Sequence, residues 1–156
     1  MSGRRLKSVV LSFLEWLIRD IPGGIGERVR SLYYSRVLGK CGVGLRVSEG
    51  VIFENPSNIF VGDNVWFLPF SIITGSSGYG VPKDRIHKKK IKKFGDFGKK
   101  LIIGNQVSIG AYNIIHGFGG LKIGNYVTTS ARVSIYSHSH MPSDPDNPEV
   151  ITYSNS

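Results

Sequence analysis

The chain repeats one phrase, first as Leu101-Ile-Ile-Gly-Asn-Gln-Val-Ser-Ile-Gly-Ala111 and again as Leu121-Lys-Ile-Gly-Asn-Tyr-Val-Thr-Thr-Ser-Ala131. A third copy, Ile59-Phe-Val-Gly-Asp-Asn-Val-Trp-Phe-Leu-Pro69, lies upstream. Similarity at a fixed short period is typical of stacked repeats, because a unit that cannot bury its own apolar face must pack against the next unit. The repeated phrase therefore predicts a solenoid.

Mostly apolar residues recur at every sixth position within each copy and beyond it. A spacing of six is not helical, and it favours short strands separated by tight corners, with β-branched residues in the strands and Gly or Asn at the corners. Three such sides would make one triangular coil. The expected inward positions are Val61, Phe67 and Ile73, then Ile103, Ile109 and Ile115, then Ile123, Thr129 and Ile135.

The distances between the copies predict where the stack is interrupted. Ile123 follows Ile103 by twenty residues, which is three hexads with a two-residue excursion near 118–120. Ile103 follows Val61 by forty-two residues, so a long insertion must leave the stack, and the Gly- and Lys-rich segment at about 76–100 is the candidate. We expect three to four coils, close to the minimum for a stable stack.

The N-terminal segment differs from the rest, and it divides the chain into 1–40 and a β-helix domain at 41–156. Residues 1–22 carry a basic start and one apolar helical face, which is too short and too charged to span a bilayer. They read either as a helical cap over the open end of the solenoid or as an element lying on a membrane surface. A second helix is predicted from Glu27 to Leu38, with Arg28, Arg30 and Arg36 on its outer side.

The net charge of +9 lies mainly in two segments. Residues 83–100 contribute +7 and residues 1–40 contribute +5, so the remainder is acidic. The basic loop offers few aromatic side chains for stacking on bases, which disfavours a nucleic-acid partner. The lone Cys41 suggests a reducing compartment, and we expect a cytoplasmic protein, with the inner face of the membrane as its alternative site.

Several motifs of the chain resemble those of the hexapeptide-repeat acyltransferases. They are the hexads, the Gly-Asp-Asn-Val and Gly-Asn-x-Val coil starts, Asn55-Pro-Ser-Asn-Ile59 and Ile135-Tyr-Ser-His-Ser-His140. Within that family the chain is most similar to sugar O-acetyltransferases related to maltose and galactoside acetyltransferases, over roughly residues 24 to 150. The resemblance implies a left-handed parallel β-helix and a homotrimer with active sites between subunits. It also implies transfer of an acetyl group from acetyl-CoA, as co-substrate, to a hydroxyl of a sugar or polysaccharide precursor, without a tightly bound cofactor or a metal.

The resemblance carries His140 over as the general base, and Asp144 as a group that orients it. His138 is the main rival for the base, because it lies two residues away. The hexad register places Thr74, His116 and Tyr136 in one column on successive coils, so His116 and Tyr136 become candidates for contacting the substrate. Asn113 is a further candidate for substrate binding. Lys99 and Lys100 are candidates for the phosphates of coenzyme A.

Two departures from the family keep other functions open. Leu68 replaces an Asn that the maltose-type enzymes use, and the family's further C-terminal hexads, which help to bind coenzyme A, do not follow in the sequence. The chain could therefore be part of a longer transferase or a non-catalytic scaffold. A zinc hydratase of the carbonic anhydrase type, with His116, His138 and His140 as ligands, is a less favoured alternative, because their spacing does not match that family.

Overall fold

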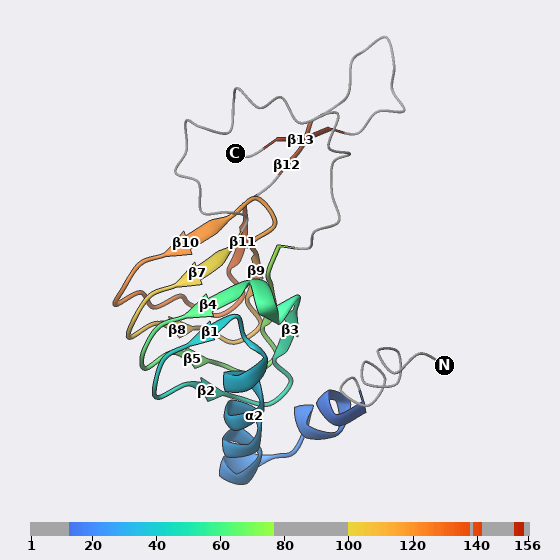
Figure 1. The fold of residues 1–156 in the computed structure, drawn as a ribbon, viewed down its shortest axis with the longest axis vertical. Helices are drawn as coiled ribbons and strands as arrows, with labels where there is room; N and C mark the ends of the chain where they lie inside the picture. Colours follow the sequence, from blue (N-terminus) through green and yellow to red (C-terminus); the bar gives the residue numbers. More distant parts are fainter. Residues whose placement is uncertain (1–12, 77–99, 138, 142–151, 155–156) are drawn as a thin grey trace.

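The structure is a computed structural model that describes residues 13–76, 100–137, 139–141 and 152–154. Three sheets of parallel strands form its body (Figure 1). The first sheet has the order β1 (Lys40–Cys41), β4 (Ile59–Val61), β7 (Leu101–Ile103) and β10 (Leu121–Ile123). The second has β2 (Arg46–Val47), β5 (Trp66–Phe67) and β8 (Ser108–Ile109), and the third has β3 (Ile52–Glu54), β6 (Ile72–Thr74), β9 (Ile114–His116) and β11 (Ser134–Tyr136).

The chain visits the three sheets in rotation, and each of the first three circuits adds one strand to each sheet. In the fourth circuit, an isolated parallel bridge between Ser108 and Thr128 takes the place of a strand in the second sheet. The fold is mainly β, as predicted, and it is compatible with a parallel β-helix. A separate antiparallel pair, β12 (Ser139–Met141) and β13 (Thr152–Ser154), follows the last circuit.

The stacking register predicted from the repeat is confirmed. Ile123 pairs with Ile103, and Ile103 pairs with Val61 across the long insertion. A first circuit, which the three copies of the phrase did not reveal, lies beneath them and places Cys41 against Val61 and Val47 against Phe67. The described part of the chain therefore contains four circuits.

The core lies inside the three sheets, and most strands contribute at least one buried residue to it. Most of the predicted inward residues are buried, while Thr129 and Ile135 in the last circuit are half-buried because no further circuit covers them in the described residues. Burial of β-branched and aromatic side chains is the main stabilising term for such a stack. The buried inward positions are Val47, Phe53, Val61, Phe67, Ile73, Ile103, Ile109, Ile115 and Ile123.

A ladder of Asp and Asn side chains joins the circuits at the Gly-Asp and Gly-Asn corners. The N–H of Val43 donates to Oδ1 of Asp63 at 2.9 Å, and the N–H of Asp63 donates to Oδ1 of Asn105 at 2.8 Å. The N–H of Asn105 in turn donates to Oδ1 of Asn125 at 2.8 Å. Each side chain thus satisfies a corner N–H of the preceding circuit, which the sheets themselves leave without a partner.

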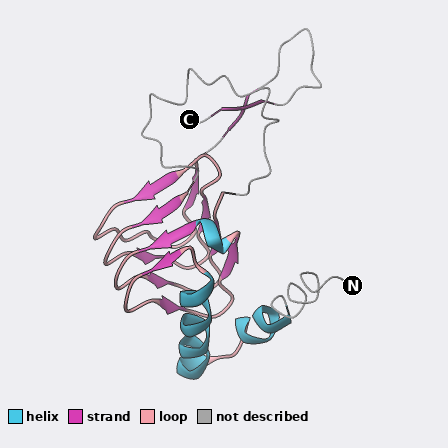
Figure 2. Cartoon of the chain, in the orientation of Figure 1, coloured by secondary structure: helices cyan, strands magenta, loops and turns pink. Residues whose placement is uncertain are grey.

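Two helices lie at the end of the stack that is formed by the first circuit (Figure 2). Residues 13–19 are helical, and α2 runs over Gly23–Val37, so it begins four residues before the predicted Glu27. Its N-cap Pro22 is extended and has no side-chain cap, and the local sequence therefore gave no capping signal for the early start. A short 3-10 helix, η1 (Pro56–Asn58), links β3 to β4.

The predicted outward position of Arg30 is wrong, because its side chain is 1% exposed. Its Nη1 donates to the carbonyls of Ile18, Arg19 and Ile21, at the end of the first helix, and its Nε donates to the carbonyl of Val47 at 3.1 Å. The carbonyls at a helix C-terminus lack intrahelical donors and carry partial negative charge, which a guanidinium satisfies. Arg30 therefore joins both helices to the edge strand β2.

The same edge strand receives a second bond from α2. The N–H of Val47 donates to Oγ of Ser31 at 3.0 Å, so both backbone groups of Val47 on this side are satisfied by helix side chains. An uncovered sheet edge is a site for unwanted pairing, and α2 occupies this one. Outside the stack, Glu27 and Arg46 form an ion pair of 2.9 Å.

Most of the Lys-rich insertion predicted at about 76–100 falls outside the described residues; Ser76 and Lys100 mark the ends of the described chain on either side. Across the described ranges, none of the helices is long and apolar enough to cross a membrane.

Candidate functional site

A column of polar and aromatic residues runs along the third sheet. Thr74 pairs with His116, and His116 pairs with Tyr136, as the hexad register predicted. The column extends one circuit further to Glu54, which pairs with Thr74 and which the sequence analysis missed. Glu54 belongs to the first circuit, whose sequence lacks the repeated phrase, so the signal that located the other three was absent there.

Within the column Thr74 is buried and His116 is half-buried, whereas Glu54 and Tyr136 at its two ends are exposed. The Thr74 side chain is fully buried and its Oγ1 donates to the carboxylate of Glu54 at 3.0 Å. The half-buried His116 ring lies 5.1 Å from the ring of Tyr136 and 5.5 Å from that of Phe118, both measured between centroids. Tyr136 is 52% exposed, so an imidazole flanked by two aromatic rings lies beside a phenol that solvent reaches. Such a surface can offer hydrogen bonds and ring contacts to a polar ligand.

The backbone around His116 is fixed by the last circuit. The carbonyl of His116 accepts bonds from both the N–H and the Oγ of Ser137, each at 3.0 Å. The same Oγ accepts a bond from the N–H of Gly119. This short network ties the turn after β9 to the end of β11, and it holds the His116 and Tyr136 side chains in one register.

His140 lies in β12, four residues after Tyr136, and its backbone pairs with Tyr153. The strand that carries Tyr136 ends there, and the next begins at Ser139. Side-chain positions in β12 are not described, and His138, Asp144 and Lys99 lie outside the described residues. The roles of His140, His138, Asp144 and Lys99 therefore stay predictions.

Asn113 lies inside the stack. It is fully buried, its Nδ2 donates to Oγ1 of Thr129, and its Oδ1 accepts the N–H of Val133 at 2.8 Å. Thr129 also accepts the N–H of Gly110 at 2.9 Å. These contacts show that Asn113 joins the third circuit to the fourth, while its contact with a substrate stays a prediction.

Lys100 is exposed directly before β7, and its Nζ lies 4.7 Å from the centroid of the Phe60 ring. A cation over an aromatic face is attracted by the ring quadrupole, which gives this ammonium a preferred position on the outside of the first sheet. Its interaction with a coenzyme phosphate is a prediction that the described contacts do not test.

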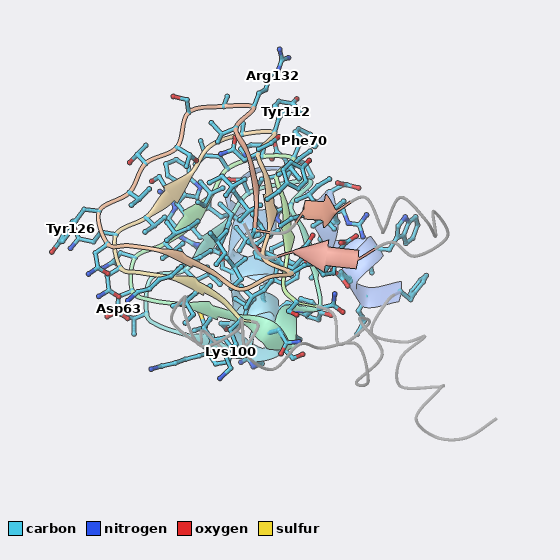
Figure 3. All side chains as sticks on the ribbon, turned by 90° about the horizontal axis from the view of Figure 1, so that it is seen from above. Asp63, Phe70, Lys100, Tyr112, Tyr126 and Arg132 are labelled. Atoms are coloured by element: carbon cyan, nitrogen blue, oxygen red, sulfur yellow. The ribbon has the colours of Figure 1, made fainter. Side chains whose placement is uncertain are left out.

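Sequence analysis also missed a second column, at the corner between the second and third sheets (Figure 3). Phe70 and Tyr112 stack with centroids 5.3 Å apart, and the Arg132 guanidinium lies 5.9 Å from the Tyr112 ring centroid. All three have positive φ, near 60°, which bulky residues rarely adopt. They directly follow the three copies of the repeated phrase, so their equivalence was present in the sequence, but their left-handed conformation was not.

Among the described residues, His, Cys, Asp and Glu side chains form no group of three that could hold a metal ion. A cleft of about 420 Å³ lies between α2 and the first circuit, lined by residues that include Arg28, Ser31 and Arg46, away from every predicted site residue.

No protein-family model, curated protein or solved structure matches the chain.

Proposed function

We propose that this protein is an O-acetyltransferase that moves an acetyl group from acetyl-CoA to a hydroxyl of a sugar or polysaccharide precursor. We further propose that its three parallel sheets form the left-handed β-helix of the hexapeptide-repeat acyltransferases. The fold supports this proposal through its circuits of two- and three-residue strands, which repeat every twenty residues where no insertion intervenes.

The observation that carries the proposal is the column along the third sheet. It sets His116 against Tyr136 on the last two circuits, and the chain continues from Tyr136 directly to His140. An imidazole and a phenol on adjacent rungs provide donors and acceptors for a polyhydroxylated acceptor. The histidine proposed as base follows the second rung by four residues.

In the proposed reaction, the neutral imidazole of His140 removes the proton from the acceptor hydroxyl as the oxygen attacks the thioester carbonyl. The C–S bond then breaks, and the proton passes from the imidazolium to the leaving thiolate, so that an ester and free coenzyme A are formed. General-base catalysis of this kind contributes typically about 10²–10⁴-fold. Asp144 would hold the imidazole in its reactive orientation, and His138 is the alternative base.

The donor site in this proposal combines basic side chains of the chain with a neighbouring subunit. Lys99 and Lys100 suit the phosphates of coenzyme A by charge. We propose a homotrimer, in which a neighbouring subunit supplies part of the donor site.

Calorimetric titration of acetyl-CoA into the purified chain tests this proposal without knowledge of the acceptor. We expect saturable binding near one site per subunit, weaker with dephospho-CoA if the lysines bind the 3′-phosphate. A Lys99→Ala/Lys100→Ala variant should show the same loss for acetyl-CoA. Complete absence of binding by the folded chain would overturn the transferase proposal and favour a scaffold.

A further inference from the structure

The first helix presents two different faces. Glu15 and Ile18 point inward, where Glu15 accepts a 2.9 Å hydrogen bond from the hydroxyl of Tyr34 and Ile18 is buried. Phe13, Trp16 and Leu17 lie on the other face and are 59%, 61% and 52% exposed. The helix is therefore held to the protein by one face while the other offers large apolar side chains to the surroundings.

The second helix repeats this division. Gly26, Arg30 and Tyr34 form its buried face against the first helix and the first circuit. Ile25, Val29 and Leu32 are exposed, and their spacing of four and then three residues puts them on one stripe of the helix. We call the exposed apolar side chains of the two helices the outer helical face; it comprises Phe13, Leu14, Trp16, Leu17, Ile25, Val29 and Leu32.

The charges around the outer helical face are mostly positive. Two of the three acidic side chains in residues 1–40 are bound within the protein, Glu15 by Tyr34 and Glu27 by Arg46. The basic Arg28 and Arg36 are exposed on α2, and the sequence upstream of the first helix contains Arg4, Arg5 and Lys7. The segment 1–40 carries a net charge of +5 in the sequence.

We infer that the outer helical face docks on the surface of an anionic phospholipid bilayer. Aromatic and aliphatic side chains would enter the boundary between headgroups and acyl chains, and the arginines would meet the lipid phosphates. A second copy of the chain is a poorer occupant, because a symmetric contact would bring the exposed Arg28 and Arg36 of two copies together. A partner protein with a neutral apolar groove would offer the surrounding arginines no anionic groups to contact.

The arrangement of the elements agrees with such docking. Both helices lie at the β1–β2 end of the stack, whereas β10 and β11 lie at the far end (Figure 1). A bilayer at the helices would therefore meet the end of the stack that is remote from β10 and β11. This inference does not depend on the proposed enzymatic function.

Co-sedimentation of the full chain with vesicles tests the inference. We expect binding to vesicles of phosphatidylcholine with about 30% phosphatidylserine, weak binding to pure phosphatidylcholine, and loss of binding at high salt. The variant Phe13→Ser/Trp16→Ser/Leu17→Ser should bind about tenfold more weakly or worse. Tyr126→Ser is the matched control, because Tyr126 is a 75% exposed aromatic residue on the fourth circuit, and it should bind like wild type.

A spectroscopic readout separates membrane insertion from mere charge attraction. The chain has two tryptophans, so Trp66→Phe leaves Trp16 as the reporter, and its emission should shift to the blue on anionic vesicles. Absence of binding to anionic vesicles, or full binding by the triple variant, would overturn the inference. If the triple substitution dissociates an oligomer and the wild type does not bind vesicles, the outer helical face is a protein interface. That result would also overturn the inference.

Discussion

The N–H of Asp63 donates a 2.8 Å hydrogen bond to Oδ1 of Asn105, forty-two residues further along the chain. These two residues occupy the same place in successive circuits, and the same bond recurs between Asn105 and Asn125. An Asp or Asn follows each of these corner glycines because its side chain accepts the N–H of the corner in the preceding circuit. That N–H has no partner in the sheets.

Removing one acceptor from this ladder should destabilise the fold modestly. Asp63→Ala leaves the N–H of Val43 without its 2.9 Å acceptor, and because this corner is exposed, water can replace part of the bond. We expect a loss of about 0.5–1.5 kcal/mol in the free energy of unfolding, measured by urea denaturation. Asp63→Asn keeps Oδ1 and is the control. Equal stability losses in both variants would show that the charge of Asp63, and not its acceptor, matters.

Substitution of a corner glycine by alanine should destabilise the fold more when atoms of the next circuit lie close to the new Cβ. A Cβ at Gly62 would lie 2.2 Å from Oδ1 of Asn105 and 2.8 Å from the backbone of Gly104, whereas a Cβ at Gly124 would meet nothing within 4 Å. Gly62→Ala should therefore cost about 1–3 kcal/mol of stability. Gly124→Ala, at the same position of the last circuit, should change stability by less than about 0.5 kcal/mol. Similar midpoints for both variants in urea would contradict this close approach.

The register of the stack could be predicted because apolar residues recur in the sequence at a fixed period. Ile103 and Ile123 recur at a fixed spacing, and a one-residue slip would turn apolar side chains outward. The Thr74, His116 and Tyr136 column followed from that period alone. Glu54 was missed because the first circuit fits the same geometry with different residues, so its sequence does not resemble the repeated phrase.

Features that depend on tertiary contacts were not predictable in this way. Arg30 was expected outside because an arginine on a helix is usually solvated, and only the position of the first helix shows which carbonyls it satisfies. The positive φ of Phe70, Tyr112 and Arg132 is imposed by the corner and opposes the preference of these residue types. The residues proposed for catalysis after Tyr136 lie beyond the periodic pattern, and their placement rests on the resemblance.

Substitution of Arg30 should lower the free energy of unfolding more than most other substitutions in the chain. Arg30→Met would leave the buried carbonyl of Val47 and the half-buried carbonyl of Ile21 without these donors, which lie at 3.1 and 2.7 Å in the native structure. We expect a loss of about 2–5 kcal/mol, detected as a lower urea midpoint. Arg30→Lys should recover only part, because an ammonium cannot reach several carbonyls as the planar guanidinium does. Arg28→Met, on the exposed side of α2, is the control and should stay within about 0.5 kcal/mol of wild type.

Tyr34 should make the fold sensitive to alkaline pH. Burial of its hydroxyl, and secondarily the neighbouring Glu15 carboxylate, raises the pKa of Tyr34 above its ordinary value. The unfolded chain loses this proton near pH 10, while the folded state retains it to higher pH. The stabilising contribution is therefore fully present below about pH 10 and decreases as the pH rises further.

Urea unfolding of wild type and Tyr34→Phe at several pH values measures this contribution. The free energy of unfolding of Tyr34→Phe should fall less steeply between about pH 9 and about pH 11 than that of wild type. Tyr126→Phe, which removes an exposed hydroxyl, should follow wild type. Parallel curves for Tyr34→Phe and wild type would show that the hydroxyl is not protected in the folded state.

The proposed catalytic roles make different predictions for His116, His138 and His140. His140→Ala should reduce kcat/KM for acetyl transfer to a screened saccharide acceptor by about 10²–10⁴-fold, with an unchanged circular dichroism spectrum and unchanged acetyl-CoA affinity. His116→Ala should mainly raise KM for the acceptor, because His116 is proposed to contact substrate beside Tyr136 and not to take the proton. His138→Ala is the matched control, two residues from the base, and should retain most of the activity. If His140→Ala kept most of its activity while His138→Ala lost it, the general base would be His138, and loss in His116→Ala alone would move the proton transfer onto the column of the third sheet.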